Sequence, residues 1–195
     1  MRVIAGKYRS RPLKSMPGLE IRPTSDKLRE TLFNVLCAGN EDALVGATFL
    51  DLFAGTGAVG IEALSRGAAN VVFVESSAKA AVLIQENLKS LGAEEGFWLL
   101  RSNVTAGLRK LKSKATAVNV VFLDPPYAGQ ALYAETLEAL DRWSGVDAGT
   151  LVIAEHDKRF DPGETVGSLR RQRKLTQGDA ALSFYRRAVT ESVLP

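Results

Sequence analysis

The chain has 195 residues, enough for one sizeable domain or for one domain with a small appendage. Its composition, 46% hydrophobic and 24% charged, is typical of a soluble globular protein. No apolar run approaches the roughly 18 residues of a membrane-spanning helix, and the N-terminus lacks the apolar core of a signal peptide. The single cysteine, Cys37, excludes an internal disulfide, so we expect a cytoplasmic protein, with a monomer as the default state.

Charge is distributed unevenly along the chain. Residues 1–30 carry 8 Lys/Arg and 3 Asp/Glu, a balance of +5, whereas residues 31–167 carry 11 and 17, a balance of −6. Residues 168–195 carry 6 and 2, a balance of +4. Basic ends around an acidic middle suggest flanks that meet a polyanion and a core that handles a small molecule. Ordinary solvated surface charge is the alternative, and the charge pattern does not choose between them.

The first predicted elements lie in the basic N-terminal segment. The stretch RVIAGKYRSRPLKS alternates loosely and contains Gly6 and Pro12, which predicts a short β-hairpin. The PTSD sequence at residues 23–26 is a helix-start signal, and the apolar residues from Leu28 to Leu36 then share one helical face.

From about residue 47 strands and helices alternate. Strands are predicted at ATFLDLF, NVVFVE, FWLLRS, NVVFLD and GTLVIAEH, and the tail forms two more around a turn at residues 177–179. This order implies an α/β fold, a Rossmann-like, seven-stranded and mostly parallel sheet with helices on both faces. Ligands of such sheets bind outside the carboxyl ends of the strands, where DLFAG, VES, RSN and LDPPY lie.

A glycine-rich loop joins the first of these strands to a helix. In DLFAGTGAVG, Gly55, Gly57 and Gly60 form the pattern G-x-G-x-x-G, which permits a tight turn and close approach of a ligand to the backbone. Glu75 ends the next strand 20 residues after Gly55, the spacing at which a carboxylate accepts hydrogen bonds from ribose hydroxyls.

Asp51 distinguishes the two cofactors that suit this loop, a dinucleotide and S-adenosylmethionine. An anionic Asp51 would repel a pyrophosphate and attract the ammonium and sulfonium of S-adenosylmethionine, although it could merely cap the turn. Asn103 is expected beside the adenine, or as the cap of a helix, or both. The residues expected to bind S-adenosylmethionine are Asp51, Phe53, Ala54, Gly55, Thr56, Gly57, Glu75, Ser76, Asn103 and Val104.

The tetrapeptide Asp-Pro-Pro-Tyr at residues 124–127 follows the fourth strand. An exocyclic amine becomes nucleophilic when two acceptors bind its two N–H groups, and the Asp124 carboxylate and the Pro125 carbonyl can serve in that way. Pro125 and Pro126 hold the carbonyl in place, and Tyr127 offers a face on which a base can stack. All four are candidate catalytic residues, and a structural Pro-Pro turn with an aromatic plug is the alternative.

Other reactive side chains indicate no further chemistry. His156, the only histidine, could act as a general base, but its place at the end of a buried strand favours a structural role. Cys37 is interpreted as a packing residue. Because no Cys/His cluster is present, no metal site is predicted.

These segments together resemble the bacterial 16S rRNA guanine-N2 methyltransferases of the RsmD type, which are class I S-adenosylmethionine-dependent enzymes. The resemblance covers nearly the whole chain and is carried by RVIAGKYRSRPL, RPTSDKLRETLFNVL, LDLFAGTGAVGIEALSRGA, VVFLDPPY and SFYRR. It implies the class I methyltransferase fold with an N-terminal β-hairpin extension. Residues 1–40 would be the extension that contacts RNA, and residues 41–195 the catalytic domain.

The resemblance also implies a substrate, a guanine of 16S rRNA within the small ribosomal subunit or its assembly intermediate. Basic residues near the N-terminus would contact rRNA phosphates, namely Arg2, Lys7, Arg9, Arg11, Lys14 and Arg22. The resemblance also implies that Arg22, Pro23 and Thr24 edge the cofactor and substrate cleft, which adds Thr24 to the residues expected to bind the cofactor.

Two other functions stay open. Asp-Pro-Pro-Tyr also suits a DNA adenine-N6 or protein glutamine N-methyltransferase, although 195 residues leave no room for a large DNA-recognition insert, and glutamine enzymes favour Asn where Asp124 stands. A non-catalytic rRNA-binding assembly factor is the other alternative, and Asp51, Glu75 and Asp124 argue against it.

Overall fold

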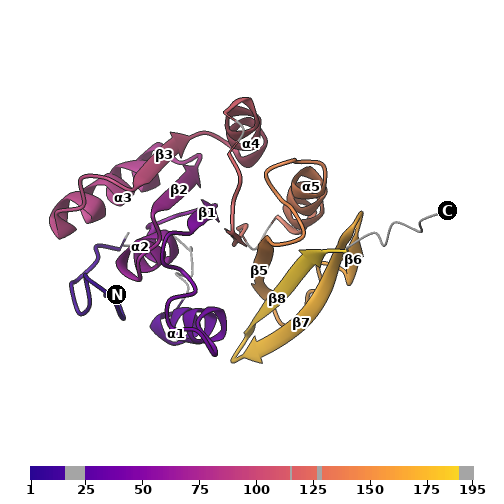
Figure 1. The fold of residues 1–195 in the computed structure, drawn as a ribbon, viewed down its shortest axis with the longest axis horizontal. Coiled ribbons are helices and arrows are strands. Elements are labelled where there is room, and N and C mark those ends of the chain that lie inside the picture. Colours follow the sequence, from indigo (N-terminus) through magenta and orange to yellow (C-terminus); the bar gives the residue numbers. More distant parts are fainter. Residues whose placement is uncertain (16–24, 115, 127–128, 189–195) are drawn as a thin grey trace.

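The computed structural model describes residues 1–15, 25–114, 116–126 and 129–188. Its elements follow the predicted alternation closely (Figure 1). The helices are α1 (Asp26–Leu36), α2 (Ala58–Ser65), α3 (Ala78–Leu91), α4 (Val104–Ser113) and α5 (Gln130–Asp141). The strands are β1 (Thr48–Leu52), β2 (Asn70–Glu75), β3 (Phe97–Arg101), β4 (Val120–Leu123), β5 (Leu151–Asp157), β6 (Thr165–Val166), β7 (Leu169–Gln177) and β8 (Ala180–Arg187).

The described strands form one sheet in the order β3-β2-β1-β4-β5-β8-β7-β6. Strands β1 to β5 are parallel, and β8, β7 and β6 add antiparallel strands beyond β5. The predicted tail hairpin is confirmed, with Gln177 opposite Ala180. The sheet has one strand more than the expected seven among the described residues, because the two-residue β6 pairs with the start of β7.

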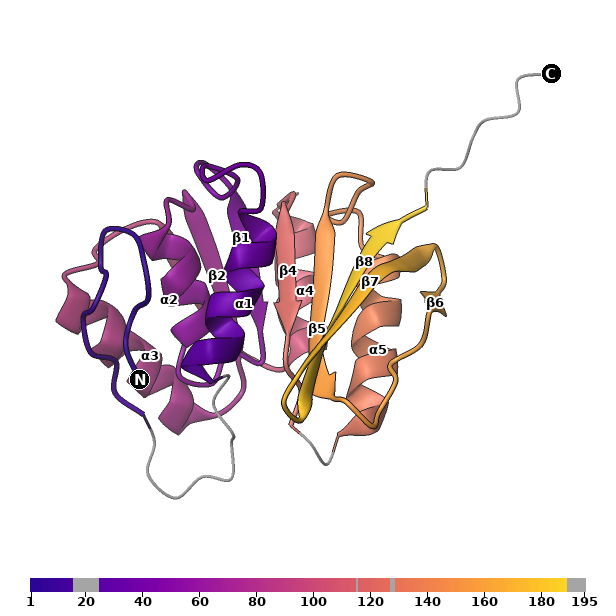
Figure 2. The same ribbon diagram turned by 90° about the horizontal axis from the view of Figure 1, so that it is seen from below.

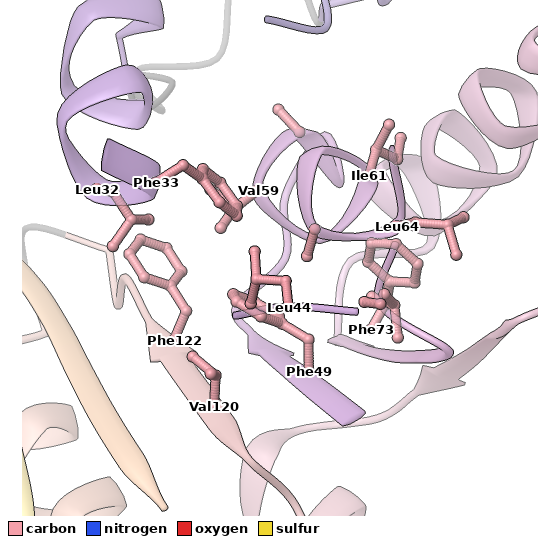
Figure 3. Close-up of a cluster of buried hydrophobic side chains, with 14 of the residues drawn as sticks. Leu32, Phe33, Leu44, Phe49, Val59, Ile61, Leu64, Phe73, Val120 and Phe122 are labelled. Atoms are coloured by element: carbon pink, nitrogen blue, oxygen red, sulfur yellow. The ribbon is translucent and has the colours of Figure 1, made fainter. Parts of the chain in front are cut away.

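Alternate residues of the central strands enter two separate hydrophobic cores, as burial of both sheet faces requires. On one face Phe49, Phe73 and Phe122 pack against α1, α2 and α3, and Figure 3 shows Phe33 and Ile61 from these helices above the strands. On the other face Leu50, Val74 and neighbouring residues pack against α4 and α5. The predicted Rossmann-like architecture is therefore confirmed.

The N-terminal segment forms the expected β-hairpin, although it is short. Within the described residues 1–15 one antiparallel bridge joins Arg2 to Pro12, and backbone hydrogen bonds of 3.0 and 3.1 Å between the two arms flank it. Next to this bridge, the backbone N–H groups of Ile4 and Ala5 donate to the buried Glu62 carboxylate of α2, at 2.7 and 2.9 Å. A side chain of a distant helix thus satisfies two donors of the hairpin and holds it against the rest of the fold.

The same segment is also fastened to α3. The Lys14 N–H donates to Asn87 Oδ1 at 2.8 Å, and Asn87 Nδ2 donates to the Lys14 and Thr56 carbonyls at 3.2 and 3.0 Å. Leu13 is buried in the core beneath α1, α2 and α3. The boundary at residue 40 stays a prediction, since α1 shares this core with the rest of the sheet.

The first helix begins where the sequence predicts it. Ser25 is its N-cap, and its hydroxyl accepts a hydrogen bond from the Leu28 N–H at 3.1 Å. Within the described part of the chain, no helix combines the length and the apolar character that crossing a bilayer requires.

Candidate active site

The candidate site lies at the carboxyl ends of β1 and β4, which are neighbours at the point where the strand order reverses. Leu52 pairs with Leu123 across these strands, so Asp51 and Asp124 come from adjacent strands, two positions apart along the sheet. Figure 2 shows β4 and β5 side by side, with α5 beginning near their carboxyl ends. The topology therefore brings together two acids that are 73 residues apart in the sequence.

The glycine loop has the backbone conformations that its sequence predicts. Gly55 and Gly57 have φ angles of 55° and 76°, in the left-handed region that glycine adopts without strain. Phe53 also has a positive φ, 61°, which is uncommon for a bulky residue and concentrates strain at this loop. At Gly60 a Cβ atom would lie 2.3 Å from Phe73 Cε1, so this glycine is needed for close packing of α2 on the sheet.

Asp51 is buried, and its Oδ2 accepts a hydrogen bond from the Gly60 N–H at 2.8 Å. Burial raises the pKa of Asp51 to about 8, against the lowering effect of that hydrogen bond, and the Glu75 carboxylate adds to the rise. The predicted turn-capping role is therefore present. The carboxyl group is mostly neutral at pH 7 in the free protein, and a cation placed beside it would favour the anion.

Glu75 connects the loop to the next helix. Its Oε2 accepts a hydrogen bond from the Gly55 N–H at 2.8 Å, and its Oε1 accepts one from the Ser77 N–H at 2.7 Å. Ser77 is in turn the N-cap of α3. Because each carboxylate oxygen has a second lone pair, Glu75 can hold the loop and still accept from a ligand.

A cavity of about 290 Å³ opens beside these residues. Five of the predicted cofactor residues line it, and so does Pro126 from the predicted catalytic set: Phe53, Glu75, Ser76, Asn103, Val104 and Pro126. Asn103 Oδ1 accepts a hydrogen bond from the Ala106 N–H at 2.9 Å, so this side chain both caps α4 and faces the cavity. Asp51, Ala54, Gly55, Thr56 and Gly57 form the adjoining strand end and loop rather than the cavity wall.

One wall of this cavity was not predicted from the sequence. It is formed by Ser102, which follows β3, by Thr105 of α4, by Leu132, Glu135 and Thr136 in the first turns of α5, and by Val74 of β2. The order of the elements could have predicted this wall, because a helix that directly follows a strand at the rim of the sheet presents its first turns to the ligand. Its register could not be read from the sequence, because α5 lacks a capping side chain.

Asp124 follows β4 and is half-buried. Desolvation and the nearby carboxylates of Glu155 and Asp51 raise the pKa of Asp124 well above its usual range. Pro125 behind it is buried, whereas Pro126 is exposed. A carboxylate at this position can accept a hydrogen bond from an amine N–H, and burial increases its affinity for a proton.

Three predicted site residues, Arg22, Thr24 and Tyr127, lie outside the described residues. The other basic residues of the N-terminal segment are all exposed, namely Arg2, Lys7, Arg9, Arg11 and Lys14. Two of them have partners, since Arg11 Nη2 donates to the Ser90 carbonyl at 2.7 Å and Lys14 Nζ lies 3.0 Å from Glu86 Oε2.

His156 is buried and fully engaged. Its Nδ1 lies 2.8 Å from the Asp157 carbonyl, which can only accept, and its Nε2 lies 2.9 Å from Ser183 Oγ. Nδ1 therefore carries the proton and Nε2 accepts from the serine. Burial lowers the pKa of His156, so the ring stays neutral and has the structural role that its position in the sequence favours.

Comparison with known proteins gives matches over nearly the full chain. The family described as Conserved hypothetical protein 95 matches residues 1–186. Ribosomal RNA small subunit methyltransferase D of Escherichia coli strain K12 is 36% identical over 191 residues, covering 96% of this chain and 90% of that protein. YlbH of Bacillus subtilis strain 168, provisionally named an rRNA methyltransferase, is 37% identical over 187 residues, covering 96% and 99%.

Solved structures agree with these matches. The structure of yhhF from Escherichia coli, provisionally named a methyltransferase, has a TM-score of 0.80 and 34% identity, covering 97% of this chain and 99% of that chain. A hypothetical protein of Thermus thermophilus, TTHA0928, has a TM-score of 0.79 and 31% identity, covering 94% and 98%. The likeness spans the sheet, the basic N-terminal segment and the tail hairpin together.

Proposed function

The chain belongs to the RsmD-type family of class I methyltransferases, and from this membership and the geometry of the rim we propose that it methylates 16S rRNA. The proposed reaction moves a methyl group from S-adenosylmethionine to the exocyclic N2 amine of a guanine in the small ribosomal subunit or its assembly intermediate. One observation carries the proposal: Asp124 stands at the switch point of the sheet, beside Asp51 and a ligand-sized cavity.

The residues around the cavity suit S-adenosylmethionine, which supplies an electrophilic methyl group on a sulfonium. Glu75 would accept hydrogen bonds from the ribose hydroxyls, and Asn103 would bind the edge of the adenine. Asp51 and the loop from Phe53 to Gly57 would hold the cationic amino-acid end, with Ser76 and Val104 beside the nucleoside. We assign Thr24 to the same set on the basis of the family resemblance.

The proposed catalytic step uses two acceptors. The Asp124 carboxylate and the Pro125 carbonyl would bind the two N–H groups of the guanine amine, which localises its lone pair for attack. Pro126 fixes the turn, and Tyr127 would stack on the base. After transfer, the ionised Asp124 carboxylate would accept the proton that the methylated amine releases, directly or through water.

The exposed basic residues of the N-terminal segment would bind rRNA phosphates, and Arg22 would join them at the cleft. Their contribution would be electrostatic and would therefore weaken as salt concentration rises. An rRNA substrate places the proposed reaction in the cytoplasm, and the chain would act as a monomer.

The test is transfer of tritiated methyl groups to four substrates: small ribosomal subunits, naked 16S rRNA, DNA and bulk protein. We expect label in the small subunit or its rRNA, at a guanine that nuclease digestion and chromatography identify as N2-methylguanosine. Label in DNA or protein alone would assign the chain to the other amine and amide methyltransferases. If no substrate is labelled while the protein still binds the particle, it is a non-catalytic assembly factor.

A further inference from the structure

A second cavity lies beside the candidate active site, at the carboxyl end of β5. Its volume is about 450 Å³. It meets α5 on a different face from the cofactor cavity, since it is reached by Gln130 and Tyr133, whereas Leu132 and Thr136 face the other cavity. The remaining wall comes from the loop after β5, through Asp157, Arg159, Phe160 and Asp161.

Aromatic rings form the floor of this cavity. The Tyr133 and Phe160 ring centroids are 5.0 Å apart, and the His156 ring meets both edge-on at 6.4 and 6.2 Å. The Tyr133 hydroxyl donates to the Glu155 carbonyl at 2.8 Å, which holds the ring in place. Phe160 is only half-buried and therefore presents part of an anchored, flat apolar surface to solvent.

The charged groups of the cavity wall balance one another. Arg159 donates to both Asp157 oxygens, at 3.1 and 3.0 Å. Asp161 accepts from Arg171 at 2.6 Å and from Lys174 at 3.2 Å, and Arg171 also lies 3.3 Å from Glu164. The charged lining residues are two carboxylates and one arginine, all engaged in ion pairs, so the cavity favours a neutral planar group with polar edges over a phosphate.

The strand register places this cavity close to Asp124, the proposed catalytic residue. Leu123 pairs with Ala154, so Asp124 lies level with Glu155. Asp157 is two residues further along β5, roughly 7 Å at the usual rise of a strand. A base bound at Asp124 would therefore have the next base of its strand within reach of Phe160.

We propose that this second cavity binds the base of a nucleotide adjacent to the methylated one, with the base stacked on Phe160 and its polar edge toward Gln130 and Arg159. Unstacked bases in single-stranded RNA are commonly held on aromatic side chains in this way. This inference rests on the proposed function, because it requires an RNA acceptor at Asp124.

The test compares Phe160→Leu with Phe160→Trp in methylation of small subunits. We expect Phe160→Leu to raise KM for the particle about 10-fold or more, the loss of one base–aromatic stack, and Phe160→Trp to retain activity. The affinity for S-adenosylmethionine should not change, because Phe160 does not line that cavity. Trp98→Leu is the matched control, since Trp98 is a partly exposed aromatic residue on β3, away from this rim.

An unchanged KM for Phe160→Leu, or an equal loss in Phe160→Trp, would overturn the proposal. If Phe160→Leu does not fold, Gln130→Ala provides the test, because this exposed residue can lose its amide without loss of packing. Wild-type protein that labels no rRNA would instead refute the proposed function, and this inference would fall with it.

Photo-cross-linking locates the bound base directly. The substitution Arg159→p-benzoylphenylalanine places the probe at a cavity residue whose side chain is 84% exposed. We expect the cross-link at a nucleotide next to the methylated guanine. A cross-link to a ribosomal protein or to a distant nucleotide contradicts the proposal, and the same probe at Val82, exposed on α3, serves as the control.

Discussion

At the scale of single residues, two aspartates at the switch point of the sheet, Asp51 and Asp124, both have a raised pKa. Asp51 is buried, Asp124 is half-buried, and both lie within reach of other carboxylates, so each holds its proton more tightly than a free aspartate. The same environment that makes the anions costly in the free protein makes them strong partners for a cation or an amine. Their protonation should therefore depend on what occupies the site.

Asp124→Ala should abolish methyl transfer, because it removes one of the two amine acceptors and the proposed proton acceptor. A loss of at least roughly 100-fold in kcat is expected for such a group. S-adenosylmethionine should still bind, as measured by calorimetry, since the proposed partner of Asp124 is the substrate amine and not the cofactor. Retained turnover would refute the acceptor role.

Affinity for S-adenosylmethionine should rise with pH. The pKa of Asp51 is about 8 in the free protein. Below that pH, Asp51 must release its proton before its carboxylate can pair with a cationic ligand. Affinity should increase between about pH 6 and about pH 8, by up to roughly tenfold per unit, and then level off. Calorimetry at several pH values measures this.

Asp51→Asn is the matched variant for the pH dependence. It keeps the size of the side chain and its ability to accept from Gly60, but it carries no titratable group. It should bind the cofactor more weakly and with a flat pH profile. A slope that survives in Asp51→Asn would show that another group titrates.

At the scale of elements, the contact between α2 and the sheet sets the position of the glycine loop. All eight residues of α2 are buried, and Gly60 faces β2 without room for a side chain. A shift of α2 would also move the Gly60 N–H away from Asp51. The third glycine of the motif is thus explained by packing rather than by contact with a ligand.

Gly60→Ala should destabilise the protein by about 1–3 kcal/mol, the usual cost of overpacking, because its Cβ would lie 2.3 Å from Phe73 and 2.8 Å from Val71. Denaturant unfolding measures this. Gly149→Ala is the control, since Gly149 is exposed and lacks a positive φ, and it should change stability by less than about 0.5 kcal/mol. An equal loss in the two variants would contradict the packing argument.

The N-terminal segment offers a second prediction at this scale. Arg9 is exposed and, among the described residues, its side chain makes no hydrogen bond or ion pair, which makes it a ready phosphate contact. Arg9→Ala should weaken binding to small subunits and reduce the slope of log affinity against log salt by about 1. Arg142→Ala, at the C-terminal end of α5, should change neither the affinity for small subunits nor its salt dependence. If Arg9→Ala leaves the salt slope unaltered, Arg9 does not contact a phosphate.

At the scale of the whole molecule, Glu62 joins the N-terminal segment to the sheet. Its fully buried carboxylate accepts from the Ile4 and Ala5 N–H groups and from Arg66 Nε, the last at 2.8 Å, with Arg29 Nε 3.9 Å away. Glu62 lies five residues after Gly57, so the proposed RNA arm and the cofactor loop are anchored on one short helix.

Glu62→Ala should destabilise the fold by about 3–5 kcal/mol, because it removes the buried carboxylate beside Arg29, leaving the half-exposed Asp26, and deprives two amides of their acceptor. Limited proteolysis should then cut the first 15 residues before the rest of the chain. Glu138→Ala, which breaks an exposed ion pair with Arg142, should cost no more than about 1 kcal/mol. Equal stability of the two variants would show that Glu62 does not anchor the segment.

The order of the elements, the helix starting near Ser25 and the glycine loop were predictable from the sequence because each depends on neighbours in the chain. Apolar runs, caps and positive-φ glycines act over a few residues. The meeting of Asp51 and Asp124 at the carboxyl ends of β1 and β4 was predictable as well, since parallel strands share a carboxyl edge.

Only the tertiary structure decided three further matters. The N-terminal hairpin is held against α2 because Glu62, more than fifty residues away, accepts hydrogen bonds from the Ile4 and Ala5 N–H groups. The high pKa of Asp51 depends on burial, which no local pattern encodes. The cavity lined by Phe160 exists because α5 and the loop after β5 meet in space. Local chemistry thus determined what kind of site this chain carries, and long-range packing determined its electrostatics and its boundaries.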